Sequence, residues 1–271
     1  MSSFYSIITK EVQMTEKIEE FKKHVKASRE DYVLTAEDLV NKAAKTLNLE
    51  TKNKDYFLTN ASQVIEELRQ ECWQQFLETE RDFTRGMLLS LIDEEQYKEM
   101  KGNEAVTYYV MEFPEEIYAL SLSNTQSRRS RAGKEFELII EKVFKLAGIE
   151  VESQGEIAKG FYEENNLTKL VDLIIPSAEQ FQRDKRKCIF VTAKTTLRER
   201  WQEIPEEMSR TGINVAYLAT LDKNISDNVE KLLYEGNVVI TTTKKIKNEC
   251  YANNDHLITF EDLLSIALKT V

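Results

Sequence analysis

The chain has 271 residues, of which 41% are hydrophobic and 31% are charged, and its formal net charge is −10. This composition is that of a globular protein with one elaborate domain or two domains, and no apolar run reaches the roughly 18 residues that a membrane helix needs. The two histidines and three scattered cysteines exclude His-dependent triads, histidine-based metal sites and a disulfide framework, so any chemistry must rest on carboxylates, lysine and arginine.

The first part of the chain has the pattern of helices. Thr35 and Asp38 resemble a capping box in front of the apolar residues Leu39 and Val40. A longer helix is expected to start near Asn60, because apolar residues then recur at helical spacing. We therefore predict an all-helical N-terminal domain over residues 1–115, with these apolar positions in its core.

The pattern changes over residues 116–271. A helix is expected to end near Gly148, and four short β-branched apolar runs follow, at 170–175, 188–193, 214–221 and 237–241. Further helices are expected near 199–210, 226–234 and 260–269, with Ser226 and Thr259 as candidate caps for the last two. This order predicts an α/β domain with a mixed sheet.

Three residues of this second domain could carry chemistry. Asp172 stands inside the apolar run LVDLII, Lys194 closes the run CIFVTAK, and Glu207 follows in an expected helix. Each alone has an ordinary reading: an aspartate at a wet strand edge, a lysine that extends into solvent, a surface glutamate. Together they are the residue types needed for hydrolysis of a phosphodiester with Mg²⁺, since carboxylates hold the ion and lysine assists the attacking water.

The spacing of these residues resembles the core of the PD-(D/E)XK nucleases. Asp172 is followed, after a gap, by Thr192, Ala193 and Lys194. The chain departs from that pattern twice, because Val171 replaces the proline of the family name and Thr192 replaces the middle acid.

A longer segment narrows the resemblance. Residues 194–202, KTTLRERWQ, look very much like the segment shared by restriction endonucleases of the EcoRII, SsoII and NgoMIV group. In that group the second acid lies on the following helix, where Glu207 stands here. The stretch from Ser130 to Glu137 resembles the group's upstream helix, which implies that Glu137 is an additional active-site carboxylate, with Glu135 and Glu141 as competitors.

The resemblance implies a restriction-endonuclease-like mixed sheet flanked by helices, and a type II endonuclease that uses Mg²⁺. It also implies that Arg198, Glu199 and Arg200 read bases: arginine matches guanine O6 and N7, and glutamate accepts from cytosine N4. The expected site is a palindrome with CC and GG half-sites, either CCGG with flanks or an interrupted site whose central bases are extruded. Trp201 is expected to anchor this segment rather than to act as a DNA wedge.

The expected partner is double-stranded DNA, although a net charge of −10 is unusual for a protein that binds phosphates. Arg128 and Arg131 are expected to contact the DNA backbone, with a solvated face as the alternative for Arg128. The resemblance implies a homodimer or higher homo-oligomer in the prokaryotic cytoplasm, with no membrane partner. It also implies a cognate DNA methyltransferase in the same system that is not a bound subunit.

Three other functions remain open from the sequence. The chain could be a DNA-binding module without catalysis, or a repair or junction nuclease of the same fold. It could also be a helical interaction protein whose α/β half is a scaffold, which the acidic charge would suit.

Overall fold

The computed structural model describes residues 2–157, 159–165, 171–197 and 200–270. Its contacts divide the chain into two compact units, one formed by Met1–Thr35 and Trp73–Arg131 and the other by Ala36–Cys72 and Ala132–Val271. Helices α3 (Lys54–Leu89) and α6 (Pro114–Leu146) contribute to both units. The boundary predicted between residues 115 and 116 lies in the first turn of α6 and stays a prediction.

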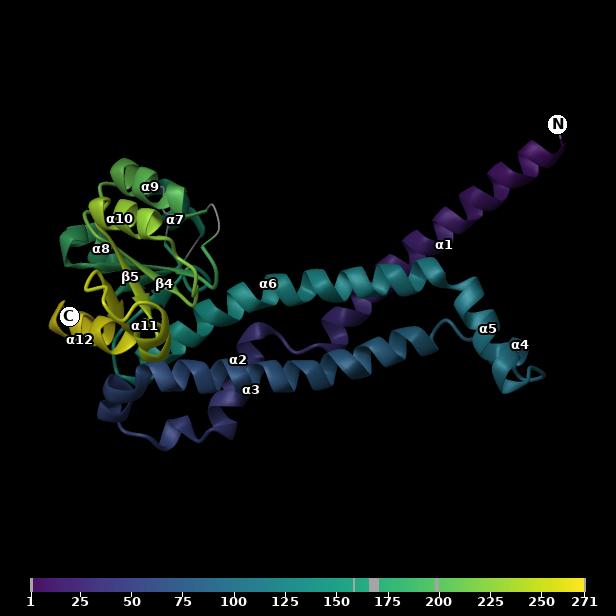
Figure 1. Ribbon diagram of the computed structural model, residues 1–271, viewed down its shortest axis with the longest axis horizontal. Helices are drawn as coiled ribbons and strands as arrows, with labels where there is room; N and C mark the ends of the chain where they lie inside the picture. Colours follow the sequence, from purple (N-terminus) through teal and green to yellow (C-terminus); the bar gives the residue numbers. More distant parts are fainter. Residues whose placement is uncertain (1, 158, 166–170, 198–199, 271) are drawn as a thin grey trace. The chain divides into compact units, whose positions relative to one another are not determined.

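The first unit is helical. It contains α1 (Ser2–Tyr32), the second half of α3, α4 (Glu94–Tyr97), α5 (Gly102–Glu112) and the first half of α6 (Figure 1). Buried residues from three of these helices form its core: Phe21, Val25, Phe76, Phe83, Met87 and Leu120. Arg29 closes one side of this core, since its guanidinium lies 4.4 Å from the centroid of the Phe83 ring and its Nη2 donates to Asn124 Oδ1 at 2.6 Å.

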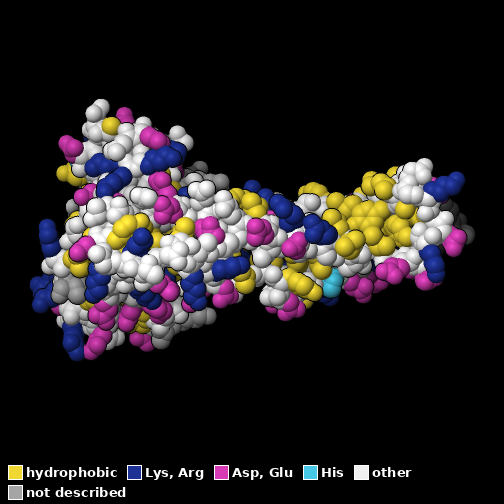
Figure 2. Space-filling view, turned by 90° about the horizontal axis from the view of Figure 1, so that it is seen from below, with side chains coloured by type: hydrophobic (Ala, Val, Ile, Leu, Met, Phe, Trp, Pro, Cys, Tyr) yellow, Lys and Arg dark blue, Asp and Glu magenta, His cyan; other side chains and the backbone are white. Residues whose placement is uncertain are grey.

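The same unit carries apolar side chains at its surface. Figure 2 shows hydrophobic side chains gathered over α5 and the adjoining ends of α3 and α6. The exposed large residues there are Leu89, Val106, Val110, Met111, Tyr118 and Leu122. None of the helices within the described ranges combines the length and apolar character needed to cross a membrane.

The second unit is built on a six-stranded mixed sheet in the order β1-β2-β3-β4-β5-β6. The strands are β1 (Glu152–Ser153), β2 (Leu173–Ile175), β3 (Ile189–Lys194), β4 (Ala216–Thr220), β5 (Val238–Thr242) and β6 (Leu257–Thr259). β1, β2 and β3 pair antiparallel, whereas β3 to β6 run parallel. In the parallel register Lys194 at the end of β3 lies opposite Thr220 at the end of β4.

Helices cover this sheet, and Figure 1 shows α9 and α10 on one side of β4 and β5, with α11 and α12 on the other. The remaining elements of the unit are α2 (Ala36–Thr46), η1 (Leu49–Thr51), α7 (Lys159–Glu164), α8 (Ala178–Asp184), η2 (Lys185–Lys187), η3 (Arg200–Gln202), α9 (Glu203–Thr211), α10 (Asp227–Glu235), α11 (Lys244–Cys250) and α12 (Phe260–Thr270). Ser226 caps α10, because its hydroxyl accepts from the Val229 amide at 3.4 Å. Thr259 serves α12 in the same way, accepting from Asp262 at 3.3 Å.

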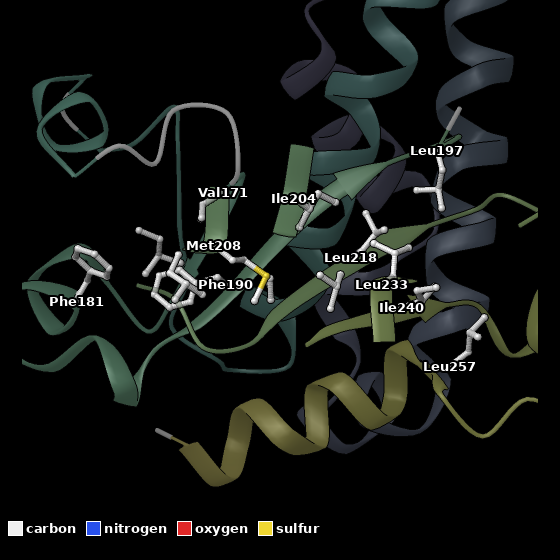
Figure 3. Close-up of a cluster of buried hydrophobic side chains, with 14 of the residues drawn as sticks. Val171, Phe181, Phe190, Leu197, Ile204, Met208, Leu218, Leu233, Ile240 and Leu257 are labelled. Atoms are coloured by element: carbon white, nitrogen blue, oxygen red, sulfur yellow. The ribbon is translucent and has the colours of Figure 1, made fainter. Parts of the chain in front are cut away.

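An apolar cluster between the sheet and one helical layer holds the site in place. Figure 3 shows Phe190 and Leu218 from the strands packed with Ile204, Met208 and Leu233 from α9 and α10. Burying such side chains stabilises the fold by roughly 1.5–3 kcal/mol each. This packing therefore holds the central strands β3 and β4 against the helices.

The predicted α/β architecture is confirmed. Each of the four predicted apolar runs overlaps a strand, and the helices expected near 199–210, 226–234 and 260–269 correspond to α9, α10 and α12. The sequence did not predict β1 and β6, the two outermost strands.

Candidate active site

Asp172 is held by the strands on both of its sides. It directly precedes β2, its backbone N–H donates to the Val191 carbonyl at 3.0 Å, and its own carbonyl accepts from Gln154 at 3.1 Å. A short apolar strand paired on both edges leaves the residue before it little freedom. The predicted carboxylate thus has a fixed backbone.

Three donors from the end of β3 converge on one oxygen of this carboxylate, Oδ2. Lys194 Nζ lies 3.2 Å away, the Ala193 amide 2.7 Å and the Thr192 hydroxyl 3.2 Å. The Asp172 side chain is 12% exposed and that of Lys194 is 26% exposed. Asp172 and Lys194, predicted from separate apolar runs, therefore form one partly buried ion pair whose geometry is fixed by neighbouring strands.

Glu137 on α6 joins this pair electrostatically. Burial raises the pKa of its carboxyl, and the negative charge of Asp172 raises it further, whereas Lys134 and Lys194 lower it. Lys134 Nζ lies 3.2 Å from Glu137 Oε2. The charges of Asp172 and Lys194 thus both act on Glu137.

The two competing glutamates are engaged elsewhere. Glu141 is buried and its Oε1 lies 2.6 Å from Lys145 Nζ. Glu135 is also buried, and after burial itself its charge is the next cause of the raised pKa of the Cys72 thiol. Among the electrostatic interactions described for this helix, the one with Asp172 therefore belongs to Glu137.

The donor set at this site fits a hard divalent cation. Two carboxylates lie close enough for the charge of one to raise the pKa of the other, in a partly buried place. A cation would relieve that repulsion, and oxygen ligands are those that Mg²⁺ prefers. Among the side chains that the structure describes, no group of three could hold a metal ion, so Asp172 and Glu137 need a further ligand.

The predicted third acid, Glu207, lies within α9, but its side chain is outside what the structure describes. Arg198 and Glu199 also lie outside the described residues. Arg200 begins η3, and its side chain is likewise not described. Trp201, the expected anchor, packs partly buried against the apolar cluster, as predicted.

The two arginines expected to contact phosphates both have protein contacts. Arg128 forms an ion pair with Glu80, in which Nε lies 2.9 Å from Oε2, and its guanidinium lies 5.6 Å from the Trp73 ring. The guanidinium of Arg131 lies 4.8 Å from the centroid of the Phe76 ring. Their predicted phosphate contacts stay a prediction, and at Arg128 a phosphate would compete with Glu80.

The sequence did not assign a role to Thr192 or Asp222. Thr192 occupies the position where a middle acid is absent, and its hydroxyl donates to Asp172. Its place two residues before Lys194, on the same face of one strand, was the available signal. Asp222 lies just beyond β4, and its Oδ2 accepts from the Leu197 amide at 2.9 Å.

The chain is similar to known proteins over most of its length. Residues 91–264 match the family described as EcoRII C terminal. The chain is 49% identical over 250 residues to the type II restriction enzyme SsoII of Shigella sonnei, an alignment that covers 92% of this chain and 82% of the relative.

Solved structures of restriction endonucleases are also similar to the chain. Metal-depleted Ecl18kI in complex with uncleaved DNA matches with a TM-score of 0.85 and 47% identity, over 93% of this chain and 84% of that one. The restriction endonuclease PspGI, solved as a complex with substrate DNA, matches with a TM-score of 0.61 and 18% identity, over 88% of this chain and 93% of that one, which is a likeness of fold.

Proposed function

The chain belongs to the EcoRII C-terminal family and is a type II site-specific deoxyribonuclease, and we propose that it cuts both strands of its DNA site in a reaction that depends on Mg²⁺. The observation that carries this proposal is the convergence of Lys194, Ala193 and Thr192 on Asp172 beside Glu137. Family membership excludes the helical interaction protein and the repair or junction nuclease that the sequence left open.

Asp172, Glu137 and Glu207 are the residues that would hold the metal ion. Because three donors already converge on Asp172 Oδ2, its other oxygen, Oδ1, is the one we assign to the ion. Glu207 supplies the further ligand that the described side chains lack. When bound, Mg²⁺ supplies stabilisation of the charge that develops on the phosphate and makes water more acidic.

Lys194 assists the attack on the phosphate. Its ammonium is held against Asp172 at 3.2 Å, so it is oriented before DNA arrives. A cation fixed in this way stabilises negative charge and orients the attacking water, without the reorganisation that a mobile side chain would need.

Arg198, Glu199 and Arg200 read the bases. They follow Lys194 within a few residues, so reading and cutting are joined by one short segment. Two arginine forks and one carboxylate match two adjacent G·C pairs, with about 1–3 kcal/mol of discrimination for each good bidentate contact. We assign a palindrome with CC and GG half-sites, either continuous or interrupted.

A palindrome with two strands to cut calls for two copies of the chain related by a two-fold axis, so the proposed active form is a homodimer or a higher homo-oligomer. Arg128 and Arg131 are assigned to the DNA backbone. The enzyme is proposed to act in a prokaryotic cytoplasm together with a separate DNA methyltransferase that protects the same site.

The test is digestion of a sequenced plasmid by the purified enzyme, once with Mg²⁺ and once with EDTA, followed by sequencing of the ends. We expect discrete fragments with Mg²⁺ only, all ending at one CC/GG palindrome. Cleavage in EDTA would contradict the metal dependence, and ends at unrelated sequences would contradict the assigned base reading. No cleavage under either condition would contradict the proposed Mg²⁺-dependent reaction at the Asp172–Lys194 pair.

A further inference from the structure

Asp222 uses both of its carboxylate oxygens to join two loops at the end of the sheet. Oδ1 accepts from the Asn224 amide at 2.9 Å and so forms a turn within its own loop. Oδ2 accepts from the Leu197 amide at 2.9 Å, across to the loop that follows β3. Leu197 is three residues after Lys194 and is directly followed by Arg198.

The loop of Asp222 is itself held from two sides. The Asp222 amide donates to Thr220 Oγ1 at 3.2 Å, and Thr220 lies opposite Lys194 in the parallel register of β3 and β4. The Tyr251 hydroxyl donates to the Asp222 carbonyl at 3.0 Å and accepts from the Ile225 amide at 2.9 Å. The carboxylate is therefore presented from a fixed backbone.

Leu197 is fixed on its other side by packing. Its side chain is 4% exposed and belongs to the apolar cluster, in the part of the cluster where Figure 3 also shows Leu218 and Leu233. Packing restrains the side chain, but it does not fix the rotation of the peptide. The hydrogen bond from the Leu197 amide to Asp222 supplies that restraint, and a hydrogen bond to a charged acceptor is about twice as strong as a neutral one.

We propose that Asp222 is a positioning residue for sequence recognition: by holding the Leu197 peptide, it sets where the base-reading segment starts relative to Lys194. This inference rests on the proposed role of Arg198, Glu199 and Arg200. It also gives a physical reason for coupling between base reading and DNA cleavage. The hydrogen bond from Leu197 to Asp222 links the segment that follows Lys194 to the loop that follows β4.

Asp222→Asn is the sharpest variant. An asparagine has one carbonyl oxygen where aspartate has two, and its other group is a donor. The oxygen can keep the turn to Asn224 while the amide nitrogen then faces the Leu197 N–H, so the size and the turn are kept and the bond between the loops is lost. Asp262→Asn is the matched control, because Asp262 also accepts a backbone N–H, that of Thr259 at 2.8 Å, in the N-terminal turn of α12.

The experiment compares the dissociation constants of cognate and scrambled duplexes in Ca²⁺, together with amide exchange of Leu197 in the free protein. We expect Asp222→Asn to lower the preference for cognate DNA about tenfold, the effect of roughly 1.4 kcal/mol, and to speed exchange of the Leu197 amide. Asp262→Asn should leave both at the wild-type value. An unchanged preference in Asp222→Asn would overturn the inference.

The outcomes distinguish a failure of this inference from a failure of the proposed base reading. A wild-type enzyme with no preference for any duplex would overturn the proposed base reading, and this inference with it. A wild-type enzyme that discriminates, beside an Asp222→Asn variant that discriminates equally, would overturn only the role of Asp222. If Asp222→Asn does not fold, Tyr251→Phe removes the donor to the Asp222 carbonyl and should lower the preference in the same direction, and an unchanged preference there would likewise overturn the inference.

Discussion

Lys194 Nζ lies 3.2 Å from Asp172 Oδ2, across the antiparallel pair of β2 and β3. The lysine ends one strand and the aspartate precedes the other, so the pair is assembled by strand register rather than by one local segment. Because the backbone amide of Ala193 also donates to the same oxygen at 2.7 Å, the position of the carboxylate is determined by the strand that carries the lysine. In the proposed reaction, metal binding by Asp172 and assistance by Lys194 would thus both depend on the end of β3.

Thr192→Val should slow cleavage by about tenfold or more, because it removes one of the donors that orient Asp172, and hydrogen bonds to charged groups contribute about 1.5–3 kcal/mol. Single-turnover cleavage at saturating Mg²⁺ measures this. Thr241→Val is the control, since the buried Thr241 hydroxyl has no hydrogen-bond partner among the described residues. Thr241→Val should cut at the wild-type rate, and a wild-type rate in Thr192→Val would remove the hydroxyl from the site.

Glu137→Gln should increase stability at neutral pH in the absence of metal. Burial and Asp172 raise the pKa of Glu137 in the folded protein, so folding binds a proton, and stability is lost as the pH rises from the ordinary glutamate value through the raised one. Glu137→Gln has no carboxyl to ionise and so lacks this loss of stability. Its higher Tm should therefore disappear at a pH below the ordinary pKa of a glutamate. Thermal unfolding in EDTA across pH measures the difference.

Divalent metal should reverse the order of the melting temperatures of the wild type and Glu137→Gln. Mg²⁺ or Ca²⁺ should raise the Tm of the wild type more than that of Glu137→Gln, because the ion binds the ionised carboxylate. Glu235→Gln is an exposed control on α10, where the carboxylate lies 3.8 Å from Lys231, and it should behave as the wild type in both media. Equal metal shifts in the wild type and Glu137→Gln would exclude Glu137 as a ligand.

Arg200→Ala should weaken cognate binding by about 1–3 kcal/mol and leave the affinity for scrambled duplex nearly unchanged, because a base contact carries sequence information and a phosphate contact does not. Binding in Ca²⁺ at fixed salt measures both affinities. Arg85→Ala removes the same charge from an exposed position on α3 and should change neither. An Arg200→Ala variant with wild-type preference would remove this residue from the base reading.

The three cysteines should react in a fixed order with an alkylating reagent at pH 8. Cys250 is exposed and should react first. Burial and then the charge of Asp184 raise the pKa of Cys188 to about 11, and burial and then Glu135 raise that of Cys72 to about 12, so little thiolate is present at either. Peptide mass spectrometry at short times should find Cys250 alone modified, and early modification of Cys72 would contradict its burial.

The four β-branched apolar runs made four strands predictable, whereas β1 with two residues and β6 with three are too short to show a period. The two compact units could not be predicted either. Their division depends on which halves of α3 and α6 contact which neighbours, and an amphipathic pattern does not identify its partner.

Asp172 and Lys194 could be found from the sequence because a charge inside or at the end of an apolar run needs an explanation. Asp222 could not, because its proposed role follows from the parallel register that places Thr220 opposite Lys194. The available hint was a carboxylate at the carboxyl end of an apolar run, at the edge of the sheet where Lys194 also ends its strand. That pattern indicates a role only once the order of the strands in the sheet is known.

The catalytic role of the Asp172–Lys194 pair is tested most directly by Lys194→Ala on an oligonucleotide that carries the mapped site, with binding measured in Ca²⁺ and cleavage in Mg²⁺. We expect cognate binding close to that of the wild type and a loss of cleavage of about 10²–10⁴-fold, while Lys231→Ala on α10 keeps both. Cleavage by Lys194→Ala at the wild-type rate would contradict the assignment of the Asp172–Lys194 pair as the catalytic centre.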